Sequence, residues 1–431
     1  MEKDYCHKSI EKKWRLSPTH PDQSIYSPNL TRQLTFLLKD IPIDFTYLVD
    51  LNRADAIHLK NRMQNREDFP DQEEITIPNL SVRSHSPNKR FLMEPRKYLE
   101  DFGWDTFKFA LSLKANPDSG KSAFLNRIKR SKSFTHKVWN AARYVNMNLR
   151  GDEDSTIDIH KASTVDKWFL HQLNCTVDQI NEFLDHGHMT DMARVLCQFF
   201  RHEFCDWYLE FSKADIQNSE TRKTLKLSLQ ILLQCLHPFI PFLTEEIHGK
   251  MNPNGKLLMD YPFPQFDSKL AFLREHAIIE HLKALISKSR QIKSENSLPS
   301  GTRSLIYITI NAPGRKNDIK SNLKYYEFLI PGGKAVIVKD FSGLPGGFRA
   351  EIQNMKIMLS LENETDRKSY VEKLERDFKQ TGIRISSLES KLSDPRFVKQ
   401  KSESDLTVLK RSLLKSHKIK EKIQKAISDF S

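Results

Sequence analysis

The sequence predicts a mainly α-helical protein built from a helical bundle at residues 91–265, a small α+β module at 266–365 and a C-terminal antiparallel coiled-coil hairpin at 366–431. Three observations predict this fold class. Apolar residues recur at steps of three and four in the first part, short β-rich runs follow in the second, and heptads fill the third. Residues 1–90 show no sustained periodicity, and we leave them unassigned.

The bundle is predicted from sets of apolar residues that would each line one face of a helix. These sets are Phe134, Val138, Val145 and Leu149; Leu173, Val177, Ile180 and Leu184; Met192, Leu196 and Phe199; and Leu225, Leu229, Leu232 and Leu236. Pro238 and Pro241 follow the last set and would end its helix. Successive amphipathic helices bury their apolar faces against one another, so a bundle is expected.

The α+β module begins with a helical pattern at residues 276–291. Three runs rich in β-branched and aromatic residues come next, at 304–310, 325–330 and 334–338, with Pro and Gly between them. Such composition is typical of short strands. We therefore expect each of the three runs to be a strand of one small sheet.

The hairpin is predicted from two apolar seams that keep a seven-residue repeat. The seams are Val371, Leu374, Phe378, Thr381, Ile385, Leu388 and Leu392, and then Leu406, Leu409, Leu413, Ser416, Lys420, Ile423 and Ile427. A short polar break at residues 393–397 separates them. Two heptad helices joined by a short link favour an antiparallel pair.

Composition narrows the classes of function. Lys and Arg number 68 against 55 Asp and Glu, a net charge of +13, which favours a polyanionic partner such as nucleic acid. The five cysteines form no C-x-x-C pair, so we expect neither a metal site nor a disulfide framework, and we predict no cofactor. No apolar run is long enough to span a membrane. We therefore expect a soluble cytoplasmic protein without a membrane partner, and an organellar location is the alternative.

The most informative segment is Ser119–Gly151, which contains eight Lys and Arg but no Asp or Glu. Phe124, Phe134, His136, Trp139 and Tyr144 are interleaved with these charges. One helix with such a sequence can offer cations to phosphates and rings to unstacked bases, which favours RNA. The alternative is that the rings belong to the protein core and the cations form a solvated face.

The same segment carries a resemblance to a known family. The run KVWNAARYV at Lys137–Val145 resembles K-L-W-N-A-x-R-F, which opens the anticodon-binding bundle of valyl-tRNA synthetases and their class I relatives. Upstream, EPRKYLEDFGWDTFKFALSL is similar to the family's helix after its K-M-S-K-S loop; downstream, HEFCDWYLEFSK and LHPFIPFLTEEIHGKM resemble bundle signatures in the same order. The resemblance implies a class I synthetase anticodon-binding bundle.

The C-terminal part favours the valyl branch of that family. Lys391–Val398 is similar to the K-L-S-N-x-x-F-V turn of the valyl coiled-coil arm, which in the family packs on the outer corner of tRNA. From Asp366 to the end, 17 Lys and Arg face 10 Asp and Glu, a net charge of +7. Such a charge suits an arm that faces phosphates, although a solvated lysine-rich hairpin is the alternative.

The sequence departs from the family where amino-acid activation would occur. Residues 84–88, SHSPN, stand where K-M-S-K-S is expected, so both phosphate-binding lysines are replaced, and no H-I-G-H loop precedes them. Lys108 replaces the family's Arg and Trp104 its small residue in the helix that follows. Residues 1–90 are therefore interpreted as a degenerate remnant of the junction with a catalytic core, and catalytic activity of the chain alone is not expected.

The leading hypothesis is a non-catalytic synthetase relative, a pseudoenzyme, that binds tRNA, in particular the tRNA of valine, through the bundle and the arm. The expected nucleic-acid-binding residues are Arg127, Lys129, Arg130, Lys132, Lys137, Trp139, Asn140 and Arg143. A second hypothesis is the tRNA-binding half of a split valine-tRNA ligase, with a separate catalytic chain as partner. A third is a structural subunit of a larger assembly.

Overall fold

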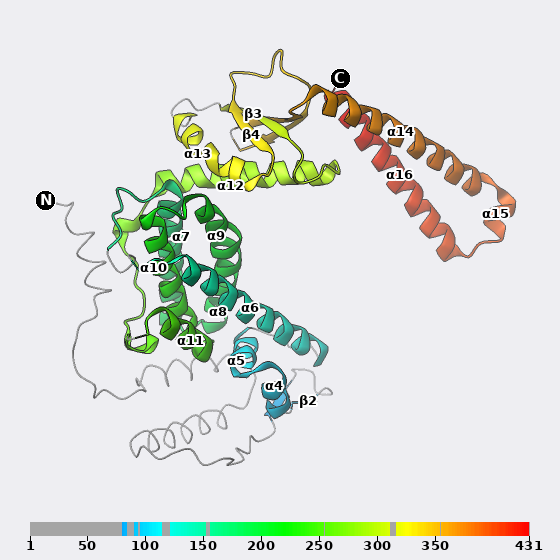
Figure 1. Ribbon diagram of the computed structural model, residues 1–431. Helices are drawn as coiled ribbons and strands as arrows, with labels where there is room; N and C mark the ends of the chain where they lie inside the picture. Colours follow the sequence, from blue (N-terminus) through cyan, green and yellow to red (C-terminus); the bar gives the residue numbers. More distant parts are fainter. Residues whose placement is uncertain are drawn as a thin grey trace. The chain divides into compact units, whose positions relative to one another are not determined.

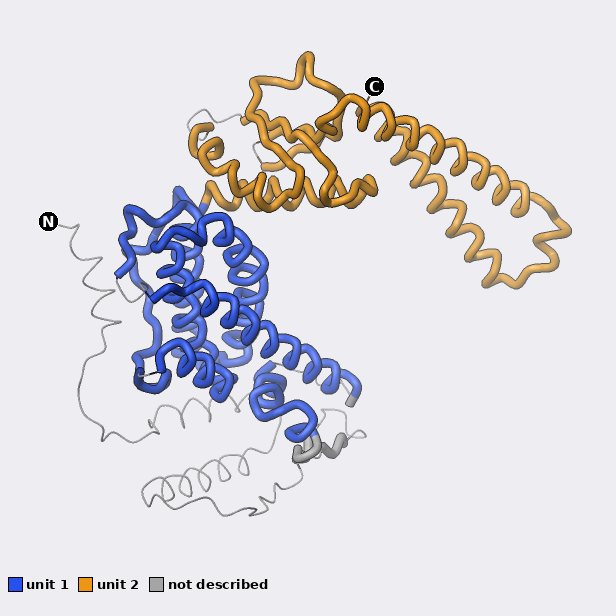
Figure 2. Tube along the Cα trace, viewed as in Figure 1, with its two compact units in different colours: residues 1–276 blue, residues 277–431 orange. Residues whose placement is uncertain are grey.

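The structure is a computed structural model in which most described residues are helical (Figure 1). It describes residues 80–83, 90–93, 95–113, 121–151, 156–253, 255–310, 316–353 and 355–430. The chain divides into two compact units, residues 1–276 and 277–431 (Figure 2). None of the described helices is long and apolar enough to cross a membrane. The interpretation of residues 84–88 as a replaced loop falls outside the described residues.

The first unit is a helical bundle that follows one antiparallel strand pair, β1 (Leu80–Arg83) and β2 (Arg90–Met93). Its α-helices are α4 (Pro95–Phe102), α5 (Trp104–Ser112), α6 (Lys121–Asn148), α7 (Thr164–Asp185), α8 (Met189–Gln198), α9 (Leu209–Ser212), α10 (Ser219–Leu236) and α11 (Pro241–Met251). A π-helical segment, η1 (Phe199–Tyr208), joins α8 to α9, and three short 3-10 turns complete it: η2 (Lys213–Asp215), η3 (Leu258–Asp260) and η4 (Ser268–Leu270).

The apolar sets that predict the bundle lie in its core, with two exceptions. Phe134, Val138 and Val145 of α6 are fully buried, and so are the four leucines that predict α10. Leu149, by contrast, lies just beyond the end of α6 and is half-buried, and Leu184 near the end of α7 is half-buried too. The helical spacing therefore predicts the core correctly except near helix ends, where the chain frays or turns away.

One buried carboxylate joins three elements of the bundle. Ser163 is the N-cap of α7. Its hydroxyl accepts the backbone N–H of Asp166, and the Asp166 carboxylate accepts the backbone N–H of Ser163, which forms a capping box. Asp166 is fully buried and also accepts hydrogen bonds from Tyr208 Oη at 2.9 Å and Thr221 Oγ1 at 2.8 Å. Burial raises the pKa of Asp166, and these donors oppose that shift. The carboxylate thus ties α7 to η1 and α10.

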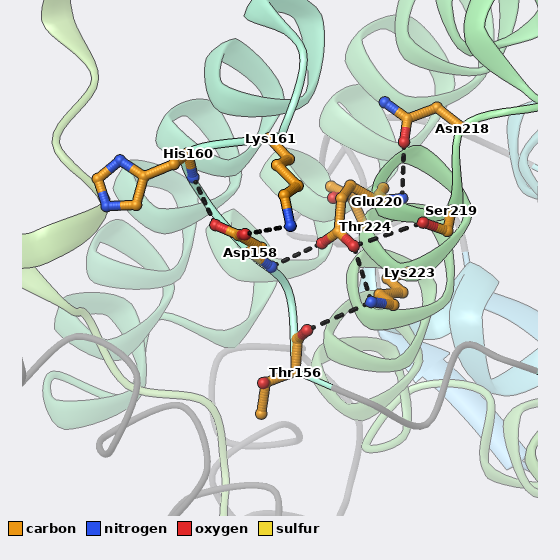
Figure 3. A network of polar contacts seen from close by, with 9 residues as sticks. All are labelled: Thr156, Asp158, His160, Lys161, Asn218, Ser219, Glu220, Lys223 and Thr224. Carbon is orange, nitrogen blue, oxygen red and sulfur yellow. Dashed lines mark hydrogen bonds and ion pairs between the residues drawn. The ribbon is translucent and has the colours of Figure 1, made fainter.

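A second polar network fixes the segment that precedes α7 (Figure 3). Glu220, in the first turn of α10, accepts the backbone N–H of Asp158 at 2.6 Å and pairs with Lys223 at 2.7 Å. Asn218 caps the same helix by accepting the N–H of Glu220. Asp158 in turn pairs with the exposed Lys161. Both oxygens of the buried Glu220 carboxylate are therefore bonded, as expected for a buried polar group, and one of them holds the loop.

The contact between α5 and α11 carries several titratable groups. Asp105 of α5 accepts the N–H groups of Phe242 and Leu243 at the start of α11, where a helix has unpaired donors. Burial, opposed by the charge of Asp105, lowers the pKa of the neighbouring Lys108 to about 8. The pKa of His237 is lowered to about 4, mainly by burial and also by the positive charges of Lys108 and His248. The junction therefore favours a neutral His237.

We expect the replacement of His237 by Gln to reduce the acid sensitivity of the fold. The pKa of His237 is about 4 when folded against an ordinary value of 6.5, so the unfolded chain binds the extra proton between these pH values. Stability therefore falls as pH falls through this window, by up to about 3 kcal/mol from this group. Gln can still bond Thr244 Oγ1, which lies 2.8 Å from His237 Nδ1.

The measurement is the free energy of unfolding in urea at pH 7 and near pH 4.5. His237→Gln should lose roughly 2–3 kcal/mol less than the wild type on acidification. His202→Gln is the control, because the side chain of His202 is largely exposed. An acid-induced loss that is the same in His237→Gln and the wild type would contradict the prediction.

The second unit is an α+β fold followed by two long helices. Its elements are α12 (Leu273–Glu295, whose first four residues fall in the first unit), β3 (Ser304–Ile310), α13 (Lys316–Leu329), β4 (Gly333–Ile337), β5 (Phe348–Ile352), β6 (Met355–Leu361), α14 (Glu364–Ser393), α15 (Pro395–Lys399) and α16 (Glu403–Phe430). The sheet has the order β4-β3-β6-β5, with β3 parallel to β4 and antiparallel to β6.

The predicted strand at residues 325–330 is wrong. Residues 325–329 belong to α13, which connects the parallel strands β3 and β4. Ile319, Leu323, Tyr326 and Leu329 recur at helical spacing and are all buried. The helical period thus outweighs the β preference of the aromatic residues. The runs at 304–310 and 334–338 form β3 and β4 as predicted, while β5 and β6 were not foreseen.

The last two long helices, α14 and α16, lie side by side and run in opposite directions (Figure 1). Every residue of the two predicted seams is buried or half-buried. The end of α16 returns to the sheet, where the Phe430 ring packs on Phe348 and Tyr370 at 4.8 and 5.5 Å. Gly347 N donates to Asp429 O at 2.7 Å. The start of α14 and the end of α16 are thus held together at the sheet, and their supercoiling as a coiled coil stays a prediction.

Candidate nucleic-acid interface

The outer face of α6 is an exposed stripe without a carboxylate. It consists of exposed residues whose spacing follows one face of the helix: Asn126, Lys129, Arg130, Ser133, His136, Asn140, Arg143 and Met147. Four of the eight residues predicted to bind nucleic acid lie on it, namely Lys129, Arg130, Asn140 and Arg143. We call this set the α6 stripe. Its side chains point to solvent and offer cations and an amide to an external ligand.

Two more of the predicted nucleic-acid-binding residues, Arg127 and Lys132, are half-buried against aromatic rings. The guanidinium carbon of Arg127 lies 5.7 Å from the centre of the Phe124 ring, and Lys132 Nζ lies 5.4 Å from that of Phe102. Burial also lowers the pKa of Arg127. Cation–π contacts of this kind stabilise the local packing. These two residues are therefore less accessible to a phosphate than those of the α6 stripe.

Lys137 is partly neutralised by a residue that its own segment does not supply. Its Nζ lies 2.7 Å from Asp206 Oδ1 of η1, and His202 Nδ1 lies 3.1 Å from the second oxygen of the same carboxylate. Glu210, one helical turn after Asp206, pairs with Lys213 instead. The segment Ser119–Gly151 contains no acidic residue, but the fold places Asp206 beside its Lys137.

The rings of α6 divide between the core and the surface. Phe124 and Phe134 are buried, which agrees with the alternative reading of the aromatics as core. Phe134 stacks on Phe109 at 4.8 Å between ring centres. Trp139 and Tyr144 are half-buried, and His136 is exposed. Only the last three can therefore reach a ligand outside the bundle.

One residue near Trp139 was not foreseen. Lys250 of α11 places its Nζ 5.9 Å from the centre of the Trp139 ring, and it also pairs with Glu246 at 2.9 Å. The two positions are more than a hundred residues apart in the sequence. Helical spacing on α11, in which Ile247 is buried and Lys250 exposed, indicates only that Lys250 faces away from the core. Its neighbour on α6 could not be deduced from that pattern.

The hairpin of α14 and α16 adds a second basic surface, in the other unit. Of the 17 Lys and Arg between Asp366 and the end of the chain, all but Arg367 and Lys420 are exposed. Lys420 is half-buried, with its Nζ 4.9 Å from the centre of the Phe378 ring. Exposed charges in water are screened but still attract a polyanion. The hairpin therefore presents its excess charge to solvent.

The histidines at 186 and 188 act as part of a turn. They follow the end of α7 and precede α8, and Gly187 between them has a φ of 71°, a conformation that favours glycine. Among the described residues, no group of three His, Cys, Asp or Glu has an arrangement that could hold a metal ion. The turn is thus explained by its backbone geometry.

Comparison with known proteins finds similarity to tRNA ligases. Residues 166–308 match the family model "Anticodon-binding domain of tRNA ligase". Similar curated proteins are the valine–tRNA ligases of Listeria monocytogenes, 25% identical over 72% of this chain, Carboxydothermus hydrogenoformans, 25% identical over 79%, and Enterococcus faecalis, 27% identical over 77%. The chain resembles a valyl-tRNA ligase. This confirms the resemblance that the sequence motifs predict.

The resemblance has limits in length and in structure. The chain spans 36%, 39% and 39% of the length of these three relatives. A crystal structure of the ternary complex of Agrobacterium radiobacter K84 agnB2 LeuRS-tRNA-LeuAMS matches 63% of this chain and 30% of that chain, with 12% identity and a TM-score of 0.34. The family match begins in α7, so the α6 stripe precedes the matched residues.

Proposed function

We propose that this chain binds tRNA, with the tRNA of valine as its preferred partner, through the α6 stripe and the basic hairpin. The observation that carries the proposal is an exposed, carboxylate-free helix face directly before a segment that matches a tRNA-ligase anticodon-binding domain. The resemblance to valine–tRNA ligases supports the choice of tRNA. A separate synthetase chain or a larger assembly is a further partner that this proposal allows.

The spacing of the stripe suits a nucleic-acid backbone. Lys129 and Arg143 are 14 residues apart in one helix, which corresponds to about 21 Å along its axis. Several consecutive phosphates of one strand occupy such a length. Lys129 and Arg130 would contact phosphates at one end, and Asn140 and Arg143 would reach phosphates or bases near the other. A partner with a different charge or shape would not use both ends.

The proposal includes the absence of amino-acid activation by this chain. Class I activation depends on cations that stabilise charge on the ATP phosphates, and residues 84–88 provide none where the resemblance places them. The rival is a split ligase, in which a separate chain supplies this chemistry. Formation of Val-tRNA by the purified chain would overturn this part of the proposal. A rise in the rate of a catalytic partner when the chain is added would instead identify the split ligase.

The identity of the RNA can be tested by crosslinking. RNA that is crosslinked by ultraviolet light to the full chain, purified under denaturing conditions and sequenced, should consist mainly of one tRNA species. Ribosomal RNA as the main species, or recovery no greater than from an unrelated protein of similar charge, would contradict tRNA binding. A mixture of tRNAs without preference would contradict the preference for valine tRNA and leave tRNA binding supported.

A further inference from the structure

A thiol and an imidazole lie one helical turn apart on α7. Cys175 Sγ is 3.9 Å from His171 Nε2, and the two residues are four positions apart, which places their side chains on the same face of the helix. Cys175 is a free, exposed cysteine, whereas His171 is only 9% exposed. One member of the pair is therefore open to solvent, and the other is held in place by the fold.

The His171 imidazole lacks the hydrogen bonds that a buried ring normally makes. Within the described residues its Nδ1 has no hydrogen-bond partner, and the group that its Nε2 faces is the thiol sulfur of Cys175. Sulfur is a weak hydrogen-bonding partner, so burial of this ring costs free energy that the protein does not recover. Neither nitrogen is committed to a strong acceptor or donor. The Nε2 lone pair is therefore available to a cation beside the sulfur.

The neighbours of the pair fix the ring and exclude a reactive thiol. The ring of His276, in the first turn of α12, has its centre 5.2 Å from that of His171, and Gln172 Nε2 lies 3.1 Å from His276 Nδ1. Burial, and then the charge of Asp178, raises the pKa of the Cys175 thiol. A nucleophilic or redox-active cysteine needs a lowered pKa, so the environment of Cys175 does not favour that role.

The two donors select the class of ion that fits them. Metal bonds are about 2.3 Å long to cysteine sulfur and about 2.0 Å to imidazole nitrogen, so two donors on opposite sides of an ion are about 4.3 Å apart, and closer at a smaller angle. The observed 3.9 Å lets both bind one ion. A structural Zn(II) needs four ligands, and the described part of the chain has no group of three His, Cys, Asp or Glu around an ion. A thiolate with few other ligands favours Cu(I).

We propose that Cys175 and His171 form a binding site for one soft monovalent cation of the Cu(I) class. The ion joins the Cys175 thiolate to His171 Nε2, and the thiol proton is released to solvent. The ion enters as Cu(I), so no electron is transferred. The absence of a C-x-x-C pair led the sequence analysis to expect no metal site. A single cysteine four positions after a histidine is a different pattern, and the site is independent of RNA binding.

The first experiment measures protection of one thiol in the full chain. The protein is reduced, freed of metal and kept without oxygen, and Cu(I) is supplied from a buffer of bicinchoninic acid. Iodoacetamide then alkylates the exposed thiols, and mass spectrometry follows the peptide that contains Cys175. When nine-tenths of the sites hold Cu(I), alkylation of Cys175 should slow about tenfold. Zn(II) at the same free concentration should protect Cys175 far less.

A histidine variant tests whether the imidazole takes part. His171→Gln removes the nitrogen donor, and it should abolish the protection by Cu(I) while Cys175 without metal reacts as in the wild type. His186→Gln is the matched control, because His186 is an exposed histidine at the end of the same helix. It should retain the full protection.

A cysteine variant keeps the test valid if His171→Gln does not fold. Cys175→Ser changes an exposed side chain, and the Cu(I) bound per chain, measured by competition with bicinchoninic acid, should fall by one ion. Cys197→Ser is its control and should bind as many ions as the wild type.

Three results would each overturn the proposal. The first is alkylation of wild-type Cys175 at the same rate with and without Cu(I). The second is equal protection in His171→Gln and the wild type, because sulfur would then bind the ion without the imidazole. The third is equal copper binding by Cys175→Ser and the wild type.

Discussion

Replacing Lys129 and Arg130 together by glutamate is expected to weaken tRNA binding about a hundredfold near 0.1 M salt. Both side chains are exposed on the α6 stripe, and the variant removes two cations and adds two anions. Each phosphate contact releases a counterion, so the slope of log affinity against log salt should become shallower by about two. Arg127 is left intact in this variant because it packs on Phe124.

A charge-matched variant tests whether position matters. Lys316→Glu with Lys320→Glu changes the net charge by the same amount on α13, where both lysines are exposed. Its affinity should fall only slightly, since neither lysine belongs to the proposed interface and a charge outside it acts through screened attraction. Equal losses in the two variants would show that net charge alone determines binding. An unchanged affinity in Lys129→Glu with Arg130→Glu would remove the α6 stripe from the interface.

The Asp166→Ala variant should lose about 4 kcal/mol of stability. The buried carboxylate accepts hydrogen bonds from Tyr208 and Thr221 and forms half of the capping box with Ser163. Its removal leaves two buried hydroxyls without their acceptor, each costing about 1–3 kcal/mol, and weakens the cap of α7 by about 1 kcal/mol. The free energy of unfolding in urea, followed by circular dichroism, measures the loss.

The control for this variant is Asp191→Ala on α8. Asp191 forms an exposed ion pair with Arg194 on the same helix, and such pairs contribute roughly 0–1 kcal/mol. If Asp166→Ala were no less stable than Asp191→Ala, the buried network would not hold α7, η1 and α10 together. tRNA affinity at low temperature should be nearly unchanged in Asp191→Ala.

The sequence predicts the helices well because burial repeats within each helix. Leu374 and Ile385 in the first seam are buried, and so are the four leucines that predict α10, as their spacing indicates. The sheet is harder to predict. β5, with the sequence FRAEI, has charged residues at two of its five positions, and α13 carries Tyr325 and Tyr326, which favour strands in isolation. Tertiary packing decides both cases, and the domain limits at 265 and 365 stay predictions.

The candidate interface is predictable from the sequence only in part, because part of it is also determined by tertiary packing. Composition locates the basic helix, and helical spacing separates Lys129 and Arg130 from the buried Phe134. The partners that come from other helices leave no local pattern. Asp206, which pairs with Lys137, and Lys250, which lies over Trp139, are found only when the chain is folded. The first contact partly neutralises a cation of α6, and the second places a cation of α11 beside a ring of α6.

The most direct test of tRNA recognition by the bundle is a ratio of two dissociation constants for the full chain. One is measured with valine tRNA, and the other with the same tRNA carrying a different anticodon, at the same salt concentration. Recognition by the bundle predicts at least about tenfold tighter binding of the unchanged tRNA, since a wrong base costs roughly 1–3 kcal/mol where it is read directly. Equal dissociation constants would contradict the account.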